Sequence, residues 1–510
     1  MFYRRELRWA EEAEALKPYL NHELFPAVDV VRVREESAAW QGWAVERAAA
    51  PEEIYGKELP RSWEYTFDFG RYCVGFPVLE FEFTKRVDAP FRLELKMAET
   101  PYELARDFNT YHGSLGRGWL QEALVVEDTA VPVIRLPRRY AFRYLKLKVE
   151  CNSSYYKVIL RNVRCDTVTA ACCASVPPLP ESADELVRRI DRIGLDTLAA
   201  CMQECFEDGP KRDRRLWLGD LRLQALVNYR TFRNYGLVKR CLLMFAAAAR
   251  EEDGIVPGCV YPAFPRPEAG NFLFDYSVLF GDMLLDYVNA SGDEDCGRDL
   301  FPVAKRQSEA ALREMADGCF HDFKRHWLFI DWKDGLEKEC AGHGVVVYSL
   351  IRTLALARRL GLEAEVADYP SLIARFQEAG RKKWFDPVRG YFIDNGQLSW
   401  AAQIWAANGE MLPAPEIREL LKRLLSAPDA VCPGGPFLYN QMILVLERYG
   451  LRDEALRLTR SYWGKMADSG ADTFWEVFDP DDPMRSPYGD AVVNSHCHAW
   501  STPVFCFRQC

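Results

Sequence analysis

The chain has 510 residues and a formal net charge of −10, and 49% of its residues are hydrophobic. This length predicts two or three domains, and the composition is that of a globular protein with a buried core rather than a disordered chain. The acidic balance excludes a general polyanion-binding role, because phosphate binding needs a basic face. No apolar run approaches the roughly 20 residues that a membrane span needs, and the N-terminus has no apolar signal core.

The cysteines indicate a reducing compartment. Sixteen of them occur in a chain without a predicted signal segment, so we expect reduced thiols and a cytoplasmic location. No Cys-x-x-Cys pair occurs, and neither Cys172–Cys173 nor Cys201 and Cys205 have partners at zinc-site spacing. We therefore expect no metal ion and no other cofactor.

The first third of the chain is predicted to be β-structure. Runs with alternating apolar and polar residues occur at Tyr65–Phe69, Val78–Phe83, Phe91–Met97, Phe142–Val149 and Tyr155–Val163. Strands with one wet and one buried face are typical of an antiparallel β-sandwich. The proline-rich stretch at Val176–Ser182 predicts a linker. It divides the chain into a β-sandwich domain with an N-terminal segment (1–180) and a second domain (181–510).

The second domain has a helical period. About twelve amphipathic stretches are predicted, among them Ala183–Phe206, Gly219–Arg233, Leu237–Arg250, Phe274–Asn289, Gly344–Leu360, Gly434–Tyr449, Leu451–Met466 and Ser495–Arg508. Junctions at Arg233–Arg240, Arg359–Glu365 and Arg448–Glu454 each place a basic residue, a glycine and a leucine between two stretches. Repeated tight turns predict stacked helical hairpins and an (α/α)6 toroid, with an irregular helical domain as the alternative. The longer loops at one mouth of such a toroid are where we expect the chemistry.

The segment Asp208–Asp220 has the densest cluster of charges. Three carboxylates (Asp208, Asp213 and Asp220) share thirteen residues with four basic residues and Trp217. Opposed charges beside a tryptophan can hold carboxylates in different electrostatic settings, which acid–base catalysis requires. A solvated ion-pair cluster at a helix start would look the same, and the spacing alone does not separate the two interpretations.

Two later segments add candidate groups. Glu476 follows two aromatic residues, which would desolvate its carboxylate and suit it to act as a base; a helix-start glutamate among core aromatics is the alternative. In Asn494–Trp500, His496 and His498 have no third ligand at a confirming distance in the sequence. A histidine that hydrogen-bonds a hydroxyl-rich ligand is therefore favoured over a metal site, with a core histidine as the alternative for His496.

Tryptophans supply a further indication. Nine of the fourteen lie in the helical part, and Trp332 and Trp475 stand in predicted loops beside a carboxylate. Aromatic faces stack on the C–H faces of pyranose rings, while carboxylates bind the hydroxyls. Trp400 and Trp405 fall in an apolar helical stretch, where a core position is expected. Loop carboxylates beside loop tryptophans on a helical toroid indicate a sugar ligand.

These segments resemble the bacterial α-L-rhamnosidases of glycoside hydrolase family 78, in a compact two-domain form. Asp208–Asp220 is similar to the family's acidic signature, GADTFWE to its Gly-Ala-Thr-Thr-x-Trp-Glu segment, and SHCHAW to a C-terminal histidine segment. Phe280-Gly281-Asp282 and Ile330-Asp331-Trp332 are weaker matches. The resemblance covers most of the chain. It implies a β-sandwich followed by a six-hairpin (α/α)6 catalytic domain that releases terminal α-L-rhamnose with inversion, using two carboxylic groups and no metal.

The resemblance also implies residue roles. Glu476 would be the general base, and Asp208, Arg212 and Asp220 would hold rhamnose hydroxyls. The pocket walls and remaining sugar contacts would be Trp217, Phe280, Asp331, Trp332, Trp475 and His498.

The sequence departs from the family pattern at the general acid. The common signature has a glutamate after Arg-Asp, but here Arg214 occupies that position and the stretch is one residue shorter. Asp213 is the expected acid and Asp220 the second candidate.

Two alternative functions stay open. The same fold and mechanism could act on another sugar, because pocket contacts set specificity. A catalytically silent sugar-binding protein, which lost its acid when arginine replaced glutamate, is the other. The predicted partner is a small rhamnoside, with no nucleic acid and no membrane, and the β-domain could pack on a second subunit in a homodimer.

Overall fold

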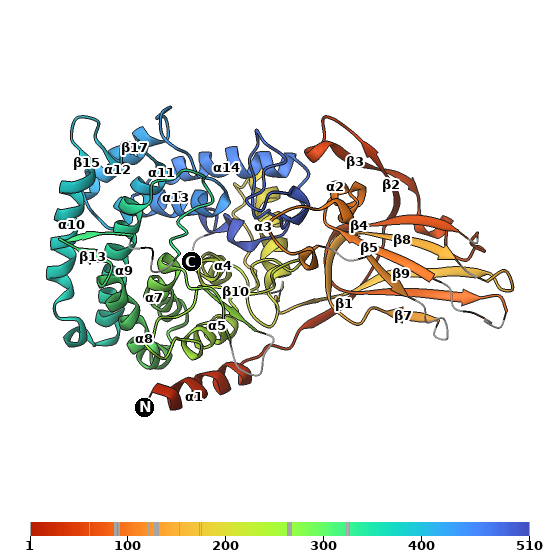
Figure 1. The fold of residues 1–510 in the computed structure, drawn as a ribbon, viewed down its shortest axis with the longest axis horizontal. Helices are drawn as coiled ribbons and strands as arrows, with labels where there is room; N and C mark the ends of the chain where they lie inside the picture. Colours follow the sequence, from red (N-terminus) through yellow and green to blue (C-terminus); the bar gives the residue numbers. More distant parts are fainter. Residues whose placement is uncertain are drawn as a thin grey trace.

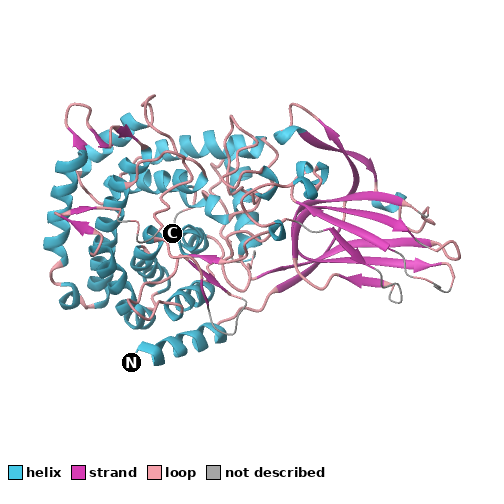
Figure 2. Cartoon of the chain, viewed as in Figure 1, coloured by secondary structure: helices cyan, strands magenta, loops and turns pink. Residues whose placement is uncertain are grey.

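The computed structural model describes residues 2–508 except 61, 86–88, 90–91, 121–122, 127–131, 152, 173, 175, 263–267, 323 and 325–326. In this part of the chain, an antiparallel β-sandwich lies beside a helical domain (Figure 1). Strands are concentrated in the sandwich, and the helical domain holds only short ones (Figure 2). Each domain encloses its own apolar core.

The nine strands described for the sandwich are linked by hydrogen bonds into one continuous antiparallel network. Its strands are β1 (Asn21–Pro26), β2 (Asp29–Glu35), β3 (Trp43–Ala49), β4 (Trp63–Phe83), β5 (Arg92–Ala98), β6 (Ala123–Val126), β7 (Val133–Arg135), β8 (Tyr140–Cys151) and β9 (Val158–Thr169). The order β1-β9-β4-β8-β5-β6 forms the main path, while β2 and β7 pair with β4 and β3 pairs with β2. A helical turn, α2 (Pro101–Ala105), follows β5 and is capped by Thr100. All five predicted strand segments overlap these strands. Tyr155–Lys157 precede β9, and Phe91 is outside the described residues.

Strand β4 organises the domain. The predicted runs Tyr65–Phe69 and Val78–Phe83 are its two ends, joined through a register shift between Asp68 and Cys73. Gly70 lies in this irregular stretch with a φ of +66°, which a side chain would disfavour. The first half of β4 pairs with β2 and β8, and its second half pairs with β7 and β9.

The helical domain follows the linker. Its helices are α3 (Glu185–Cys201), α4 (Leu218–Arg230), α5 (Tyr235–Ala247), α6 (Phe274–Val278), α7 (Phe280–Ser291), α8 (Glu294–Leu312), α9 (Glu339–Leu360), α10 (Tyr369–Trp384), α11 (Trp400–Asn408), α12 (Ala414–Leu424), α13 (Pro436–Arg448) and α14 (Arg452–Asp468). Short strands occur in the loops: β10 (Leu216–Trp217), β11 (Cys259–Tyr261), β12 (Glu268–Ala269), β13 (Met315–Ala316), β14 (Cys319–Phe320), β15 (Phe385–Asp386), β16 (Tyr391–Asp394) and β17 (Gln397–Leu398).

An inner ring closes this domain into a toroid. Helices α4, α7, α9, α11 and α13 contact one another in that order, and the 3₁₀ turn η8 (Ala499–Ser501) contacts both α13 and α4. The C-terminal segment therefore takes the sixth inner position. Ser495–Arg508 was predicted as a helix, but this prediction is wrong: the segment contains only short 3₁₀ turns, among them η8 and η9 (Val504–Cys506). Pro503 removes a backbone donor there, which disfavours a continuous helix.

Two of the three predicted glycine junctions end a helix as expected. Gly361 and Gly450 both have a φ of +68°. At the third junction Arg233 takes the left-handed conformation, with a φ of +56°, and Gly236 lies inside the first turn of α5. Helix α9 is long and apolar enough to span a membrane by length and composition alone, but 83% of the apolar 18-residue stretch that meets this criterion is buried in the domain. Its place in the inner ring accounts for its composition.

The N-terminal helix packs on the helical domain rather than on the sandwich. Helix α1 (Phe2–Ala15) lies against α5 (Figure 1). Trp9 is fully buried there and donates from its indole nitrogen to Asp299, 2.6 Å away. The segment that precedes the sandwich thus contributes to the core of the second domain.

Candidate active site

A cavity of about 280 Å³ lies among the loops of the helical domain. Its lining comes from four stretches of the helical domain (208–220, 271–276, 327–332 and 476–500), together with Leu115 of the sandwich domain. The lining residues are Leu115, Asp208, Arg212, Asp213, Arg215, Trp217, Asp220, Asn271, Leu273, Tyr276, Trp327, Phe329, Trp332, Glu476, Tyr488, His498 and Trp500. Of the eleven residues predicted for the site, eight line this cavity.

The loop before α4 contributes three carboxylates. Asp208 accepts a hydrogen bond from the backbone nitrogen of Arg215 at 3.1 Å, and its own nitrogen donates to the Arg215 carbonyl at 3.0 Å. This reciprocal pair closes the loop and leaves Asp213 at its tip. Trp217 follows in β10, which pairs with β11, and α4 begins directly after it. Asp220 lies in the first turn of α4, so its position is set by the helix.

Glu476 lies opposite this loop and is held by three donors. Arg212 and the hydroxyl of Tyr488 donate to its carboxylate, and the backbone nitrogen of Ser495 donates at 3.2 Å. The Glu476 nitrogen in turn donates to the Ser495 carbonyl at 3.0 Å. The same guanidinium of Arg212 approaches Asp213 with 3.5 Å between Nη1 and Oδ1. One arginine thus contacts carboxylates on both sides of the cavity.

Asp220 and His498 form the floor of the cavity. Both are buried, and His498 Nδ1 lies 3.5 Å from Asp220 Oδ1. Neither atom has a hydrogen-bond partner in the described part of the chain. Burial, together with the charge of Arg212, lowers the pKa of His498 well below its usual value, so the imidazole is neutral. A neutral imidazole and a carboxylate without partners can both bind a hydroxyl group.

The aspartates of the cavity share a raised pKa. Burial raises the pKa of Asp208 well above its usual value, and the nearby Asp213 adds to this effect. Burial and the charge of Glu476 do the same for Asp220. The pKa of Asp213 is raised by burial and Glu476 against the opposing charges of Arg212 and Arg215. Ionising every carboxylate in one buried site costs free energy, because each negative charge repels the others and is shielded from water. The site can therefore retain a proton at neutral pH.

Aromatic rings form the walls. Phe329 and Trp332 have ring centroids 4.9 Å apart, Trp332 and Tyr488 5.7 Å, and Phe329 and Trp500 6.1 Å. Trp327 is 44% exposed and therefore lies at the rim. Rings of this kind beside carboxylates match the chemistry of a sugar, whose C–H faces stack while its hydroxyls donate hydrogen bonds.

Arg214 turns away from the cavity. Its backbone has a φ of +60°, and its Nε donates to the Pro210 carbonyl at 2.6 Å. Burial and the nearby charge of Arg139 lower its pKa to about 10, while Glu207 opposes the shift. The arginine at this position therefore does not line the cavity, whereas Asp213 does.

Three predicted residues lie outside the cavity, and the structure corrects their assignment. Phe280 is fully buried at the start of α7. Asp331 is buried and accepts from the Gly434 nitrogen at 2.5 Å, so its carboxylate holds the loop that presents Trp332. Trp475 packs on Trp40 with a centroid distance of 5.0 Å, on the other side of its segment from Glu476. Trp475 is therefore buried against Trp40 and does not line the cavity, contrary to the prediction.

Several lining residues were missed. Tyr488, which donates to Glu476, stands in a loop of prolines, glycines and acidic residues with no sequence feature that marks it. Leu115 comes from the other domain, and the backbone nitrogen of its neighbour Ser114 donates to the Tyr488 carbonyl at 2.7 Å. Trp500 belongs to a segment already identified, SHCHAW, and could have been included. No local pattern predicts Leu115, because its position depends on the contact between the domains.

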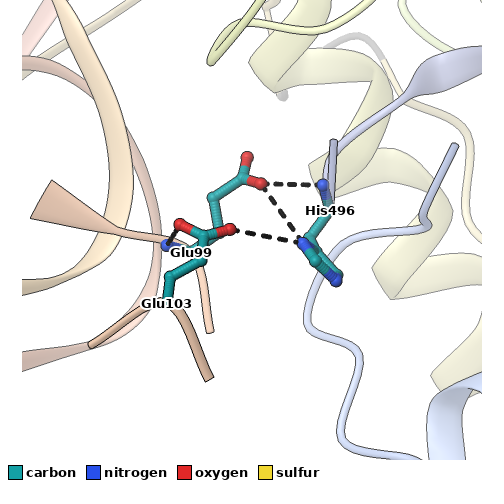
Figure 3. Close-up of side chains that lie close together, drawn as sticks. All are labelled: Glu99, Glu103 and His496. Atoms are coloured by element: carbon teal, nitrogen blue, oxygen red, sulfur yellow. Dashed lines mark hydrogen bonds and ion pairs between the residues drawn. The ribbon is translucent and has the colours of Figure 1, made fainter. Parts of the chain in front are cut away.

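One group among the described residues has the composition of a metal site. Ligand atoms of Glu99, Glu103 and His496 all lie within 4.8 Å of one another. Figure 3 shows the two glutamates from the sandwich facing the histidine of the C-terminal segment. The ammonium of Lys211, however, lies 2.8 Å from Glu99 Oε2 and 2.7 Å from Glu103 Oε1. A cation of the chain itself thus already lies between the two carboxylates and balances one of their charges.

Two family models match the chain. Residues 27–167 match the glycosyl hydrolase family 78 alpha-rhamnosidase N-terminal domain, and residues 180–508 match the bacterial alpha-L-rhamnosidase 6 hairpin glycosidase domain. None of the curated proteins matches.

Solved structures with the same fold include a rhamnosidase from Klebsiella oxytoca with rhamnose bound. It shares 40% identity with a TM-score of 0.93, and the match covers 99% of this chain and 98% of that one. The family 78 rhamnosidase of Bacillus sp. GL1 shares 22% identity with a TM-score of 0.75, over 91% of this chain and 49% of that one. The Streptomyces avermitilis alpha-L-rhamnosidase complexed with L-rhamnose shares 17% identity with a TM-score of 0.67, over 96% and 44%.

Proposed function

The chain belongs to glycoside hydrolase family 78, the bacterial α-L-rhamnosidases, and we propose that it releases terminal α-L-rhamnose with inversion, using Glu476 as base and Asp213 as acid. The observation that carries this mechanism is the guanidinium of Arg212, which contacts both carboxylates across the cavity. An inverting pair needs roughly 6.5–9.5 Å between its carboxyl groups to seat a water. Asp213 and Glu476 both line the cavity, and the guanidinium of Arg212 contacts each of them.

The two carboxyl groups have different surroundings, as the two roles require. Glu476 accepts from Arg212, Tyr488 and Ser495, so its lone pairs are fixed in direction and can take the proton of an attacking water. Asp213 has a raised pKa because of burial, which favours the protonated form needed to donate to the leaving oxygen. The charge of Glu476 also stabilises an oxocarbenium-like transition state.

The remaining groups would bind the sugar. Asp208, Asp220 and His498 would accept or donate hydrogen bonds to rhamnose hydroxyls, and Trp332 would cover the apolar face of the ring. A cavity of about 280 Å³ is near the lower end for small-molecule sites, which suits a single terminal sugar. Leu115 and the exposed ring of Trp327 lie where an aglycone would leave the cavity.

The alternative of a silent sugar-binding protein has less support. It requires that the acid was lost with the glutamate, but Asp213 lines the cavity in its place. No observation in the cavity favours another sugar over rhamnose. We also propose a cytoplasmic location, which is supported by the thirteen cysteines of the described chain that are free thiols.

Replacement of the base tests the mechanism. Glu476→Gln should lower turnover of a nitrophenyl α-L-rhamnoside by roughly 10²–10⁴, the usual contribution of a positioned acid or base. The single carbonyl oxygen of Gln can still accept from Arg212 and the Ser495 nitrogen, which share one oxygen of Glu476, so we expect a folded protein, and the thermal unfolding midpoint checks this. A panel of nitrophenyl glycosides on the wild type should show a preference for rhamnose. Turnover of Glu476→Gln near the wild-type value would remove Glu476 from the mechanism.

A further inference from the structure

A buried cluster of charged side chains joins the sandwich domain to the loop before α4 (208–217), which carries Asp213 and is called the catalytic loop below. Its members are Glu99, which precedes the capping residue of α2, Glu103 within α2, Lys211 of the catalytic loop, and His496 of the C-terminal segment. The side chains of Lys211, Glu99 and Glu103 are each at most 1% exposed. Buried charges at this depth are costly unless they are fully paired, so the arrangement of the cluster is tightly constrained.

Lys211 uses its three donors on three different acceptors. Its ammonium donates to Glu103 Oε1 at 2.7 Å and to the Asn494 carbonyl at 2.7 Å, and it lies 2.8 Å from Glu99 Oε2. Two acceptors belong to the sandwich domain and the third belongs to the C-terminal segment. An ammonium has three N–H groups and no acceptor, so this site satisfies it completely.

The carboxylates are fixed in turn by further donors. Glu99 accepts from the hydroxyl of Tyr72 at 2.5 Å and from the backbone nitrogen of His496 at 2.8 Å. Glu103 Oε2 accepts from the Glu99 nitrogen at 3.0 Å. Figure 3 shows the contact of both carboxylates with His496. The opposing charges raise the pKa of Lys211 and lower that of Glu99 to about 2 despite burial, so both remain charged.

The cluster involves the catalytic loop and the C-terminal segment, in each case at a residue next to a group that holds Glu476. Lys211 immediately precedes Arg212 and Asp213 in the chain. Asn494, whose carbonyl accepts from Lys211, immediately precedes Ser495, whose nitrogen donates to Glu476. A movement of Lys211 would therefore displace the acid loop and the support of the base together.

We propose that Lys211 is a positioning residue, and that through Glu99 and Glu103 the sandwich domain sets the geometry between Asp213 and Glu476. This inference rests on the proposed function. It assigns the cluster to alignment rather than to metal binding, because the ammonium occupies the place that a cation would take. Misplacement of catalytic groups by about 1 Å can cost 10²-fold in rate, so loss of this anchor should affect turnover strongly.

The test compares three variants. Lys211→Met should lower kcat on a nitrophenyl α-L-rhamnoside by about 10–100-fold, measured well below its own unfolding midpoint. Glu103→Gln is milder, because it leaves the contact of Lys211 with Glu99 and keeps an acceptor for the Glu99 nitrogen; we expect a smaller loss in the same direction. The control is Arg508→Met, which breaks another buried ion pair, with Asp191 (6% side-chain exposure each); neither residue lines the cavity. It should lower the unfolding midpoint but keep kcat within about twofold.

Amide hydrogen exchange gives a readout that does not depend on activity. Lys211→Met should speed exchange in both segments, 208–215 and 493–498, whereas Arg508→Met should not. A wild type inert on rhamnosides would overturn the proposed function, and exchange would still decide the role of Lys211. If Lys211→Met does not fold, Glu103→Gln decides. A folded Lys211→Met or Glu103→Gln with wild-type kcat and exchange would overturn the inference, as would a stoichiometric metal ion whose removal by a chelator abolishes activity.

Discussion

Arg214 and Asp213 occupy the part of the catalytic loop where the family signature usually carries its acidic glutamate. The Arg214 side chain is directed to the Pro210 carbonyl, so only Asp213 offers a carboxyl group to the cavity at this point. Aspartate is shorter than glutamate by one methylene. The substrate or the loop must therefore lie closer to the acid here than a glutamate would require.

Leaving-group dependence distinguishes the acid from a binding carboxylate. A general acid matters most when the leaving group is poor, so Asp213→Asn should depress turnover of an alkyl or disaccharide rhamnoside at least about tenfold more than that of a nitrophenyl rhamnoside. Asp220→Asn is the matched control, because it removes another carboxylate of the same cavity. It should weaken both substrates to a similar extent. If the dependence on the leaving group follows Asp220 instead, the assignment of the acid moves to that residue.

The buried aspartates should make the protein less stable as pH rises. The folded state raises the pKa of Asp220, so it binds this proton more tightly than the unfolded chain does. The stabilisation is fully present below the unfolded pKa, about 3.9, and is lost as pH rises through the folded value. Asp220→Asn removes this penalty, and each tenfold difference in proton affinity between the folded and unfolded states corresponds to about 1.4 kcal/mol. We expect its unfolding midpoint to exceed the wild-type value at pH 7.5 and to approach it at pH 4.5. An equal difference at both pH values would contradict this account.

Helix α4 is the element that fixes one side of the site. It begins at Leu218, carries Asp220 in its first turn, and packs so closely on α6 that a Cβ added at Gly219 would lie 2.3 Å from the Tyr276 ring. Tyr276 also lines the cavity. The glycine thus allows a close approach that no other residue could make without moving a wall of the site.

Substitution of this glycine tests the importance of the contact. Gly219→Ala should destabilise the protein by roughly 1–3 kcal/mol through overpacking and raise KM by displacing Tyr276. Gly236→Ala is the matched control in the first turn of α5, where the nearest atom to the added Cβ is 3.8 Å away. It should be neutral or stabilise the protein by up to about 1 kcal/mol, because alanine favours a helix. Urea unfolding and steady-state kinetics of both variants measure this difference. A Gly219→Ala protein as stable as Gly236→Ala would contradict it.

At the scale of elements, the sequence predicted which segments contribute to the site, but it did not predict which way their side chains point. The three charged or aromatic segments meet at one cavity because turn and charge patterns identify loops locally. The assignment failed at Trp475, where the neighbouring Glu476 faces the cavity and the tryptophan faces Trp40. It also failed at Ser495–Arg508, where the 3.6-residue pattern of apolar residues predicted a helix in a segment that packs irregularly between α13 and α4.

Over the whole molecule, the division into strands and helices followed from hydrophobic periodicity, and the contact between domains did not. Helix α1 precedes the sandwich in the sequence but packs on α5, and Leu115 belongs to the sandwich but lines the cavity. Both depend on contacts between residues more than 100 positions apart, which no local pattern records. The cluster around Lys211 is of the same kind. The sandwich domain therefore contributes to the lining of the cavity that we propose as the active site.

The stereochemistry of the first product tests the central proposal most directly. Proton NMR during the first minutes of α-L-rhamnoside hydrolysis distinguishes the two anomers of free rhamnose before they equilibrate. If Glu476 activates water while Asp213 protonates the leaving oxygen, the β-anomer of L-rhamnose should appear first and the α-anomer only later by mutarotation. Initial appearance of the α-anomer would mean retention through a covalent intermediate, and the inverting mechanism would be wrong.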